Sequence, residues 1–223
     1  MRHLIVVLTS LMLLAIIFTA CNQAENKTEK PVTLQQKIAN AYGEENFSKI
    51  KSVAFTFNIK KDTISNARSW VWNVPGNIVS YTKGTETMTY RRDTVASEAM
   101  KKIDGMFIND QYWLLFPYHL AWDSGMNVTV KEKQMSPIGK QEYTMLTSKY
   151  DDNGGYTPGD SYDLFVDENN MIREWMFHKG GSAEPSITTT WSEPETIGGL
   201  KISTDHINAD SSFRIYFTGI KVN

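Results

Sequence analysis

The feature that most restricts the fold of this chain is a series of short segments in which apolar and polar residues alternate. Between residues 53 and 59, Val53, Phe55, Phe57 and Ile59 are separated by small or polar residues. A period of two places these four side chains on one face of a β-strand. The sequence predicts such strands over residues 53–59, 68–74, 78–83, 87–92, 126–131, 143–150, 161–167, 171–179, 186–191, 200–207 and 213–222.

Turn-forming residues separate many of these segments and favour antiparallel pairing. Pro75, Gly76 and Asn77 stand between two predicted strands, and residues 167–170 are rich in Asp and Asn, which tolerate left-handed backbone. Six Trp, ten Tyr and ten Phe also favour strands. The sequence therefore predicts a mainly β, α+β protein with a large curved antiparallel sheet. Such a sheet must bury one face, either by closing or by curling around an inserted helix.

A short amphipathic helix is expected at the start of the domain. Thr33 and Gln36 have the spacing of a capping box, in which each side chain bonds the other residue's backbone N–H. Gly43 is a typical helix stop. These signals predict a helix over residues 34–42.

The middle of the sequence predicts two further short helices. Residues 94–102 have helical composition, and residues 110–116 are apolar on nearly all sides. The second stretch predicts a buried helix that Asn109 or Asp110 caps. We expect this helix to end near Pro117, because proline removes a backbone hydrogen bond and clashes with the preceding turn.

The first residues have the pattern of an export signal. Arg2 supplies a positive charge, residues 4–18 are almost wholly apolar, and the small residues Thr19 and Ala20 follow. This pattern is typical of a cleaved signal peptide, here over residues 1–20. The apolar run is shorter than the roughly 20 residues of a membrane span.

Cys21 is the single cysteine of the chain and follows the apolar run directly. The stretch from Phe18 to Cys21 resembles the lipobox of bacterial lipoproteins, in which the cysteine receives a diacylglycerol. The resemblance implies a lipid anchor at Cys21, and Asn22 at the next position implies sorting to the outer membrane. An ordinary cleaved signal with a chance cysteine is the alternative. No disulfide can form within the chain, so stability must come from the core.

Composition separates a tether from a folded domain. Residues 21–32 are polar and lack aromatic side chains, which predicts a flexible tether. Residues 33–223 are then expected to form a single β-rich domain, a length that all-β domains often reach. The formal net charge of −2 is too balanced to favour nucleic acid as a partner.

The sequence contains no recognisable catalytic or cofactor motif. A nucleophile elbow, a phosphate-binding loop, a dinucleotide-binding glycine pattern and a zinc-binding His-Glu-x-x-His are all absent. His119, His178 and His206 lack metal-ligand spacing, so we interpret them as structural or surface residues. Asp163 and Asp167 would lie about 13 Å apart on one strand face, which is wide for a catalytic pair. The sequence predicts a protein that is not an enzyme and that holds no metal or cofactor.

The order of these elements resembles the LolA/LolB/LppX-like lipoprotein-binding fold. The hairpin of residues 162–167 and 171–175 is similar to the recurring strand, Asp, turn and strand unit of that family. Residues 107–117 and 155–160 also resemble segments of exported lipoproteins of Bacteroidetes type. The resemblance covers residues 33–222. It implies an incomplete barrel of about ten or eleven strands, with helices as a lid over an apolar cavity.

Two tripeptides resemble the O-glycosylation pattern of Bacteroidetes, in which Asp precedes Ser or Thr and an aliphatic residue. They are residues 62–64 and 93–95, with Thr63 and Thr94 as acceptors. Modification of either threonine is left open by the sequence.

Large apolar side chains of the predicted strands and inserted helix are the candidates for lining a cavity, because binding pockets are mostly apolar. They are Trp70, Trp72, Met88, Tyr90, Trp113, Phe116, Trp175 and Trp191. Each could instead simply fill the core. The sequence favours a membrane-anchored lipoprotein that binds a lipid or acyl chain in a half-barrel cavity. The alternatives are a protein-interaction module of a cell-envelope complex, without a ligand cavity, and a periplasmic hydrolase.

Overall fold

The computed structural model describes residues 31–152 and 157–223. Val32–Asn223 form one compact unit, and the account below concerns this unit. Three expectations lie outside the described residues: the signal peptide at residues 1–20, lipidation at Cys21 and nearly all of the tether at residues 21–32.

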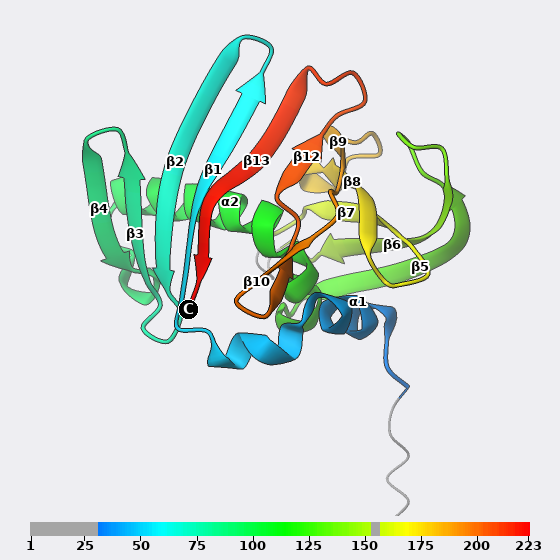
Figure 1. Ribbon diagram of the computed structural model, residues 1–223, viewed down its shortest axis with the longest axis horizontal. Coiled ribbons are helices and arrows are strands. Elements are labelled where there is room, and N and C mark those ends of the chain that lie inside the picture. The colour runs from blue at the N-terminus through cyan, green and yellow to red at the C-terminus, as the bar shows by residue number, and fades with distance from the viewer. Residues whose placement is uncertain (1–30, 153–156) are drawn as a thin grey trace, which may run out of the picture. The chain divides into compact units, whose positions relative to one another are not determined.

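Six strands of the described part form an antiparallel sheet, here called sheet A (Figure 1). Their order across the sheet is β12-β13-β1-β2-β3-β4. Their bounds are Ser52–Lys61 for β1, Ile64–Asn73 for β2, Ile78–Lys83 for β3, Glu86–Arg91 for β4, Asp205–Ile207 for β12 and Phe213–Val222 for β13. In β1, Val53, Phe55 and Phe57 are buried while the residues between them are partly exposed, as the alternation predicts.

Five more described strands form sheet B, in the antiparallel order β5-β6-β7-β8-β9. Their bounds are Met126–Met135 for β5, Glu142–Tyr150 for β6, Ser161–Val166 for β7, Ile172–His178 for β8 and Ile187–Thr190 for β9. The predicted turn between β7 and β8 is confirmed: Asp167 accepts hydrogen bonds from the backbone N–H of Asn169 and Met171, both at 2.9 Å. A separate ribbon pairs β10, Glu195–Ile197, with β11, Leu200–Ile202.

The two sheets meet where β9 and β12 lie side by side. The Ser192 N–H donates to the Asp205 carbonyl at 3.1 Å, and the Ile207 N–H donates to Thr190 Oγ1 at 3.2 Å. Within the described residues, eleven strands therefore follow one another from β4 to β5, and no ladder joins those two edges. The expected fold class, an incomplete antiparallel barrel with a helical cover, is confirmed, although two sheets rather than one form the barrel.

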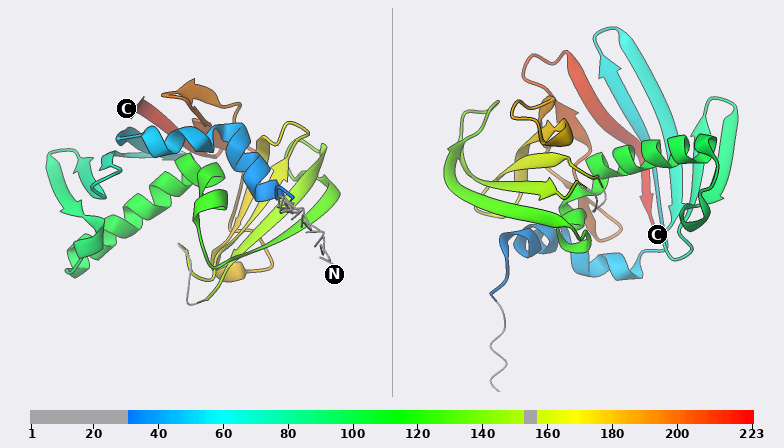
Figure 2. Two further views of the ribbon diagram at one scale, coloured as in Figure 1. Left: turned by 90° about the horizontal axis from the view of Figure 1, so that it is seen from below. Right: turned by 180° about the vertical axis from the view of Figure 1, so that it is seen from behind.

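Helix α2, Glu98–Trp122, runs across the inner side of the strands as one element of 25 residues (Figure 2). The two short helices expected over residues 94–102 and 110–116 are therefore wrong in their bounds. Ser97 is the cap, because its Oγ accepts a hydrogen bond from the Met100 N–H at 3.2 Å. The expected caps, Asn109 and Asp110, lie inside the helix.

The helix also continues through Pro117, where the sequence predicts its end. A proline costs a helix interior about 3 kcal/mol. Every residue from Asp110 to Leu120 is buried, so contacts on all sides of the helix offset that cost. Figure 2 shows that α2 bends towards its C-terminal end, which is the usual effect of proline.

Helix α1, Leu34–Tyr42, begins and ends where the sequence predicts. Thr33 Oγ1 accepts a hydrogen bond from the Gln36 N–H at 3.3 Å, and Gly43 ends the helix with a φ of 89°. The prediction of the reciprocal bond of the capping box is wrong. Gln36 Nε2 donates to Asn40 Oδ1 at 2.7 Å, and the Gln36 side chain does not bond the Thr33 backbone. The 3₁₀ turns of the described part are η1, Glu44–Lys49, η2, Arg92–Thr94, and η3, Lys179–Gly181.

The strand expected over residues 200–207 is divided between two sheets. β11 ends at Ile202 and β12 begins at Asp205. Between them, Ser203 Oγ donates to the Ser192 carbonyl at 2.7 Å, and the Thr204 N–H donates to Ser192 Oγ at 3.2 Å. The alternation of burial breaks in this segment, because Ile202 and Ser203 are both buried and Thr204 and Asp205 are both partly exposed.

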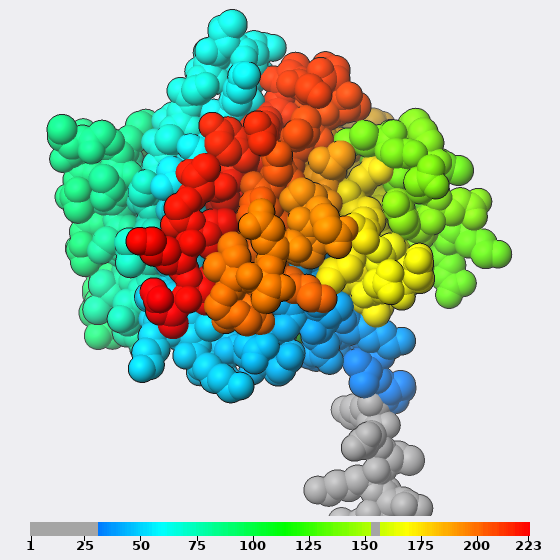
Figure 3. Space-filling view, viewed as in Figure 1, coloured from blue at the N-terminus to red at the C-terminus, as the bar shows by residue number. Residues whose placement is uncertain are grey.

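One aromatic core connects α2 to both sheets. The Phe107 ring centroid lies 5.4 Å from that of Trp70 in sheet A, and the Phe116 centroid lies 4.6 Å from that of Trp175 in sheet B. In the space-filling view, strands and α1 almost completely hide α2 (Figure 3). On this face the helix is therefore covered by strands and by α1.

Gly43 and Gly84 offer a matched test of the joint between α1 and β11. Both have positive φ, 89° and 59°, and Ala in such a conformation costs about 1–2 kcal/mol. An added Cβ at Gly43 would lie 2.8 Å from the Gly199 carbonyl oxygen, whereas at Gly84 nothing lies within 4 Å. We expect Gly43→Ala to lower the free energy of unfolding clearly more than Gly84→Ala, measured by urea denaturation. Equal losses of unfolding free energy in the two variants would show that the contact between Gly43 and Gly199 adjusts without an energetic cost.

Candidate ligand pocket

A pocket of about 280 Å³ lies between the middle of α2 and strands β7, β8 and β9. It is called the α2 pocket below. Gly105 stands at its helical rim, and residues 157–160, which lead into β7, form another part of the rim. The rest of the wall is mainly aromatic and aliphatic.

The sheet side of the α2 pocket is a row of paired residues on one face of sheet B. Tyr162 of β7 is paired with Phe177 of β8, and Phe177 is paired with Ile187 of β9. The rings of Tyr162 and Phe177 stack with centroids 5.3 Å apart. Trp175, two residues before Phe177, shares this face and also lines the pocket. Its indole Nε1–H is buried and has no hydrogen-bond partner among the described residues.

The helix side of the α2 pocket comes from two successive turns of α2. Ile108 and Tyr112 are four residues apart, as are Asn109 and Trp113, so these side chains share one face of the helix. The Trp113 ring lies 5.0 Å from that of Trp175 and connects the two sides. The pocket therefore lies mainly between a helix and a sheet, and the segment before β7 completes its rim.

A few polar groups stand at the rim of the α2 pocket. Asp160 accepts a hydrogen bond from the Gly180 N–H at 2.8 Å, and burial raises the pKa of its carboxyl above the ordinary value. Tyr162 donates its hydroxyl proton to Thr157 Oγ1 at 3.1 Å. Asn109 adds an exposed amide. An apolar wall with a few polar groups at one end suits an amphiphilic ligand.

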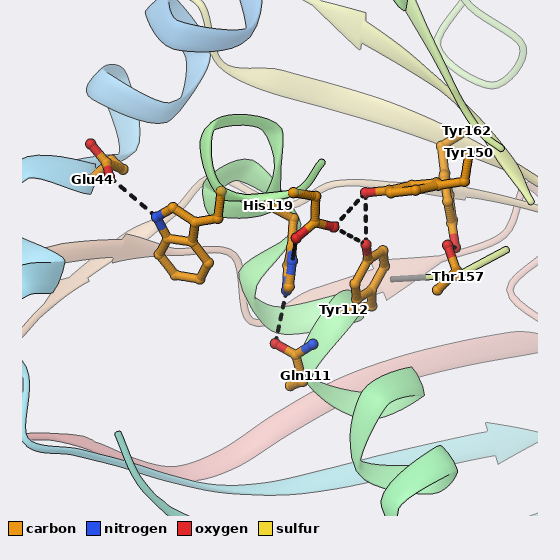
Figure 4. Close-up of polar contacts among 9 residues, drawn as sticks. Glu44, Gln111, Tyr112, His119, Tyr150, Thr157 and Tyr162 are labelled. Carbon is orange, nitrogen blue, oxygen red and sulfur yellow. Dashed lines mark hydrogen bonds and ion pairs between the residues drawn. The ribbon is translucent and has the colours of Figure 1, made fainter. Parts of the chain in front are cut away.

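Behind the pocket wall lies a buried polar network (Figure 4). Tyr112 and Tyr150 both donate their hydroxyl protons to Asp123 Oδ2, the second at 2.6 Å. Asp123 Oδ1 lies 2.8 Å from His119 Nδ1, and His119 Nε2 lies 2.9 Å from Gln111 Oε1. The Tyr112 ring lines the pocket while its hydroxyl points into this network.

The network is arranged for structure rather than for proton transfer to a ligand. Burial acts to raise the pKa of Asp123, but hydrogen bonds from His119, Tyr112 and Tyr150 hold that pKa below its ordinary value. Burial raises the pKa of both tyrosine hydroxyls, which therefore stay protonated as donors. Both ring nitrogens of His119 face partners inside the protein, and the residue is only 4% exposed.

Four of the eight expected cavity residues gather at sheet B and α2. Trp113 and Trp175 line the α2 pocket. The Phe116 ring lies 4.6 Å from that of Trp175, and Trp191 stacks on Trp175 at 5.0 Å. These last two residues fill the core and do not line the pocket.

The other four expected cavity residues belong to sheet A and do not line the α2 pocket. Trp70 Nε1 donates to Asp110 at 2.8 Å, and Tyr90 donates its hydroxyl proton to Asp104 at 3.1 Å. Trp72 and Met88 are partly buried against the aromatic core. For these residues the simpler interpretation, core packing, holds.

The three histidines of the described part stand apart from one another. His178 Nε2 lies 3.2 Å from Asp163 Oδ2, and Asp163 also accepts a hydrogen bond from Thr147. His206 is fully buried, with its ring 4.2 Å from that of Trp191. Within the described residues, no group of three or more His, Cys, Asp or Glu side chains is placed to hold a metal ion.

The sequence interpretation missed Tyr112, Tyr162, Phe177 and Ile187 as wall residues. A signal for Phe177 was present, because it stands two residues after Trp175 on the same strand and must share its face. Tyr162 and Ile187 follow only from the register of β7 and β9 against β8. That register depends on contacts between separate segments.

This chain is similar to known proteins only at the level of solved structures and at low sequence identity. No protein-family model and no curated protein sequence matches this chain. Among solved structures, a DUF1329 family protein from Desulfovibrio piger is similar with a TM-score of 0.47 and 9% identity, covering 87% of this chain and 94% of that one. An outer membrane lipoprotein-sorting protein domain from Vibrio parahaemolyticus has a TM-score of 0.40 and 10% identity, covering 85% and 93%. Both TM-scores and identities are low, so neither similarity assigns this chain to a family or a function.

None of the helices among the described residues combines the length and the apolar character needed to cross a bilayer.

Proposed function

We propose that this protein is a lipoprotein of the cell envelope that binds a lipid or another molecule with an acyl chain in the α2 pocket. In this proposal Cys21 carries the lipid anchor, and the outer membrane is its location. The observation that carries the proposal is the apolar pocket between α2 and strands β7–β9, walled by Trp113, Trp175 and Phe177. Its volume of about 280 Å³ is near the lower end of the roughly 300–1,000 Å³ of ligand pockets, enough for one chain.

The proposed activity is binding, without catalysis. A hydrolase would need an acid or base that reaches a bound ligand. The His119–Asp123 pair is buried and bonded to its neighbours, and Asp160 stands alone among the acids that line the α2 pocket. These observations support a carrier or sensor of an apolar molecule rather than an enzyme.

Gly105 provides a direct test of this function. It lies on α2 at the rim of the pocket, and a Cβ added there meets nothing within 4 Å. Gly105→Phe would place a ring at the opening, while replacing a helical glycine does not disfavour the helix. We expect the wild-type protein to release an apolar molecule on organic extraction, and Gly105→Phe to carry about ten-fold less, as measured by mass spectrometry.

Gly105→Ala is the matched control, because it changes the same position but adds only a methyl group. We expect it to retain the molecule at the wild-type level. Titration with dodecan-1-ol, followed by tryptophan fluorescence of Trp113 and Trp175, should give the same order of the three proteins. If the wild-type protein yields no apolar molecule and binds no dodecan-1-ol, the proposed function is wrong.

A further inference from the structure

The α2 pocket and a second hollow share one wall residue, Ile187. The second hollow, of about 610 Å³, lies where the end of β1, the start of β9 and the β12–β13 connection approach one another. It is called the seam hollow, because sheets A and B meet there. Ile187 contributes to the walls of both spaces.

The position of Ile187 at this border is fixed by the strand pairing. It is paired with Phe177, and the Ser186 N–H donates to the Phe177 carbonyl at 2.7 Å, so the start of β9 is anchored to β8. Towards sheet A, the hydrogen bonds between this segment and β12 among the described residues lie at Thr190 and Ser192. The seam is therefore joined at one end of β9, and the hollow occupies the other end, next to Ile187.

The two ends of the α2 pocket differ in chemistry. Asn109, Thr157 and Asp160 form a polar rim, which suits an uncharged head that carries hydroxyl groups. Thr157 and Asp160 precede β7, and Ile187 lies two strands away on β9, with Phe177 of β8 between them. Ile187 is apolar, which suits the end of a hydrocarbon chain. A chain whose head lies at the polar rim would thus point its tail towards Ile187.

We propose that Ile187 sets the length of the chain that the α2 pocket accepts. This inference rests on the proposed function. The tail of a ligand ends against the Ile187 side chain, and the seam hollow lies beyond it. A smaller side chain joins the two spaces, so that a longer chain continues into the seam hollow past Phe213 and Ala209. A larger side chain shortens the pocket.

Chain-length dependence provides the test. Each methylene group that leaves water improves affinity by about four-fold, and the gain stops when the chain reaches the end of its pocket. For the wild-type protein, we expect affinity to rise along the straight-chain 1-alkanols and then to level off. In Ile187→Ala, the chain length at which affinity stops rising should be longer than in the wild-type protein. In Ile187→Phe, it should be shorter. Displacement of a fluorescent probe from the full chain measures each affinity.

Two controls separate length selection from general damage. Thr188→Ala changes the neighbouring residue of β9 and should leave the wild-type chain length unchanged. Ile187→Val removes one methylene and should shift the levelling slightly in the direction of Ile187→Ala, which a misfolded protein would not do. If the wild-type protein binds alkanols but the affinity of every variant stops rising at the same chain length, the proposed role of Ile187 is wrong while the proposed function stands. If wild-type protein binds none, both are wrong.

Discussion

Replacing Asp110 by Asn is expected to lower the free energy of unfolding by about 3–5 kcal/mol, because it leaves a partly buried guanidinium without its counter-charge. Asp110 is 0% exposed, and its two carboxylate oxygens accept hydrogen bonds from Arg68 Nε and Nη2, both at 2.5 Å. Trp70 Nε1 donates to the same carboxylate at 2.8 Å. The amide of Asn would turn a donor towards one of these donors. Urea denaturation of wild type and variant measures the loss.

An exposed pair provides the control for this prediction. Arg91 and Asp93 also form two hydrogen bonds, at 3.1 and 2.7 Å, but the side chains are 55% and 51% exposed. Asp93→Asn should therefore cost far less stability than Asp110→Asn, because solvent screens an exposed ion pair. The double variant Arg68→Met, Asp110→Leu should recover much of the loss, because it removes both buried charges. A single Asp110→Asn variant as stable as Asp93→Asn would contradict the central role of the pair.

Stability should fall on acidification because of His206. This residue is fully buried against the rings of Trp191, Trp113 and Phe217. Burial lowers the pKa of its imidazole from 6.5 to about 4, partly opposed by backbone groups and by the charge of Asp205. Below pH 6.5 the imidazole of His206 binds a proton in the unfolded chain, whereas in the folded protein it binds this proton only near pH 4. Stability is complete above pH 6.5, and about 3 kcal/mol is lost as the pH falls towards 4.

Comparison with His206→Phe isolates this contribution from those of the carboxylates. The substitution places another ring against Trp191 and removes the titrating group. The difference in unfolding free energy between wild type and variant should be constant above pH 7 and should shift in favour of the variant towards pH 4. A difference independent of pH would show that folding does not lower the pKa of His206.

The strands of this fold could be predicted from local pattern to a useful degree. Segments such as residues 53–59 and 213–222 carry enough alternation to identify a strand and its buried face. Helix α2 could not be predicted in the same way. Pro117 and the uninterrupted apolar run before it do not indicate a continuous helix, and only burial between two sheets stabilises it.

The predicted cavity residues lie in two different places. Trp113 and Trp175 lie at the α2 pocket, whereas Trp70 and Trp72, selected for the same reason, pack in the core at sheet A. Residue type is the same in all four. What differs is which sheet lies opposite each turn of α2, and a single sequence does not contain that information.

By itself, the sequence determined the local elements: where most strands run, which face of each is apolar, where α1 begins and ends, and that no disulfide can stabilise the fold. These properties follow from neighbours within a few residues, which set period, capping and turn geometry. Only the tertiary structure decided the length of α2, the division into two sheets, the buried partners of Asp110 and the space between α2 and Ile187. Each of these depends on contacts between segments far apart in the chain. The net free energy of such contacts depends on both segments together and cannot be predicted from the local sequence of either one.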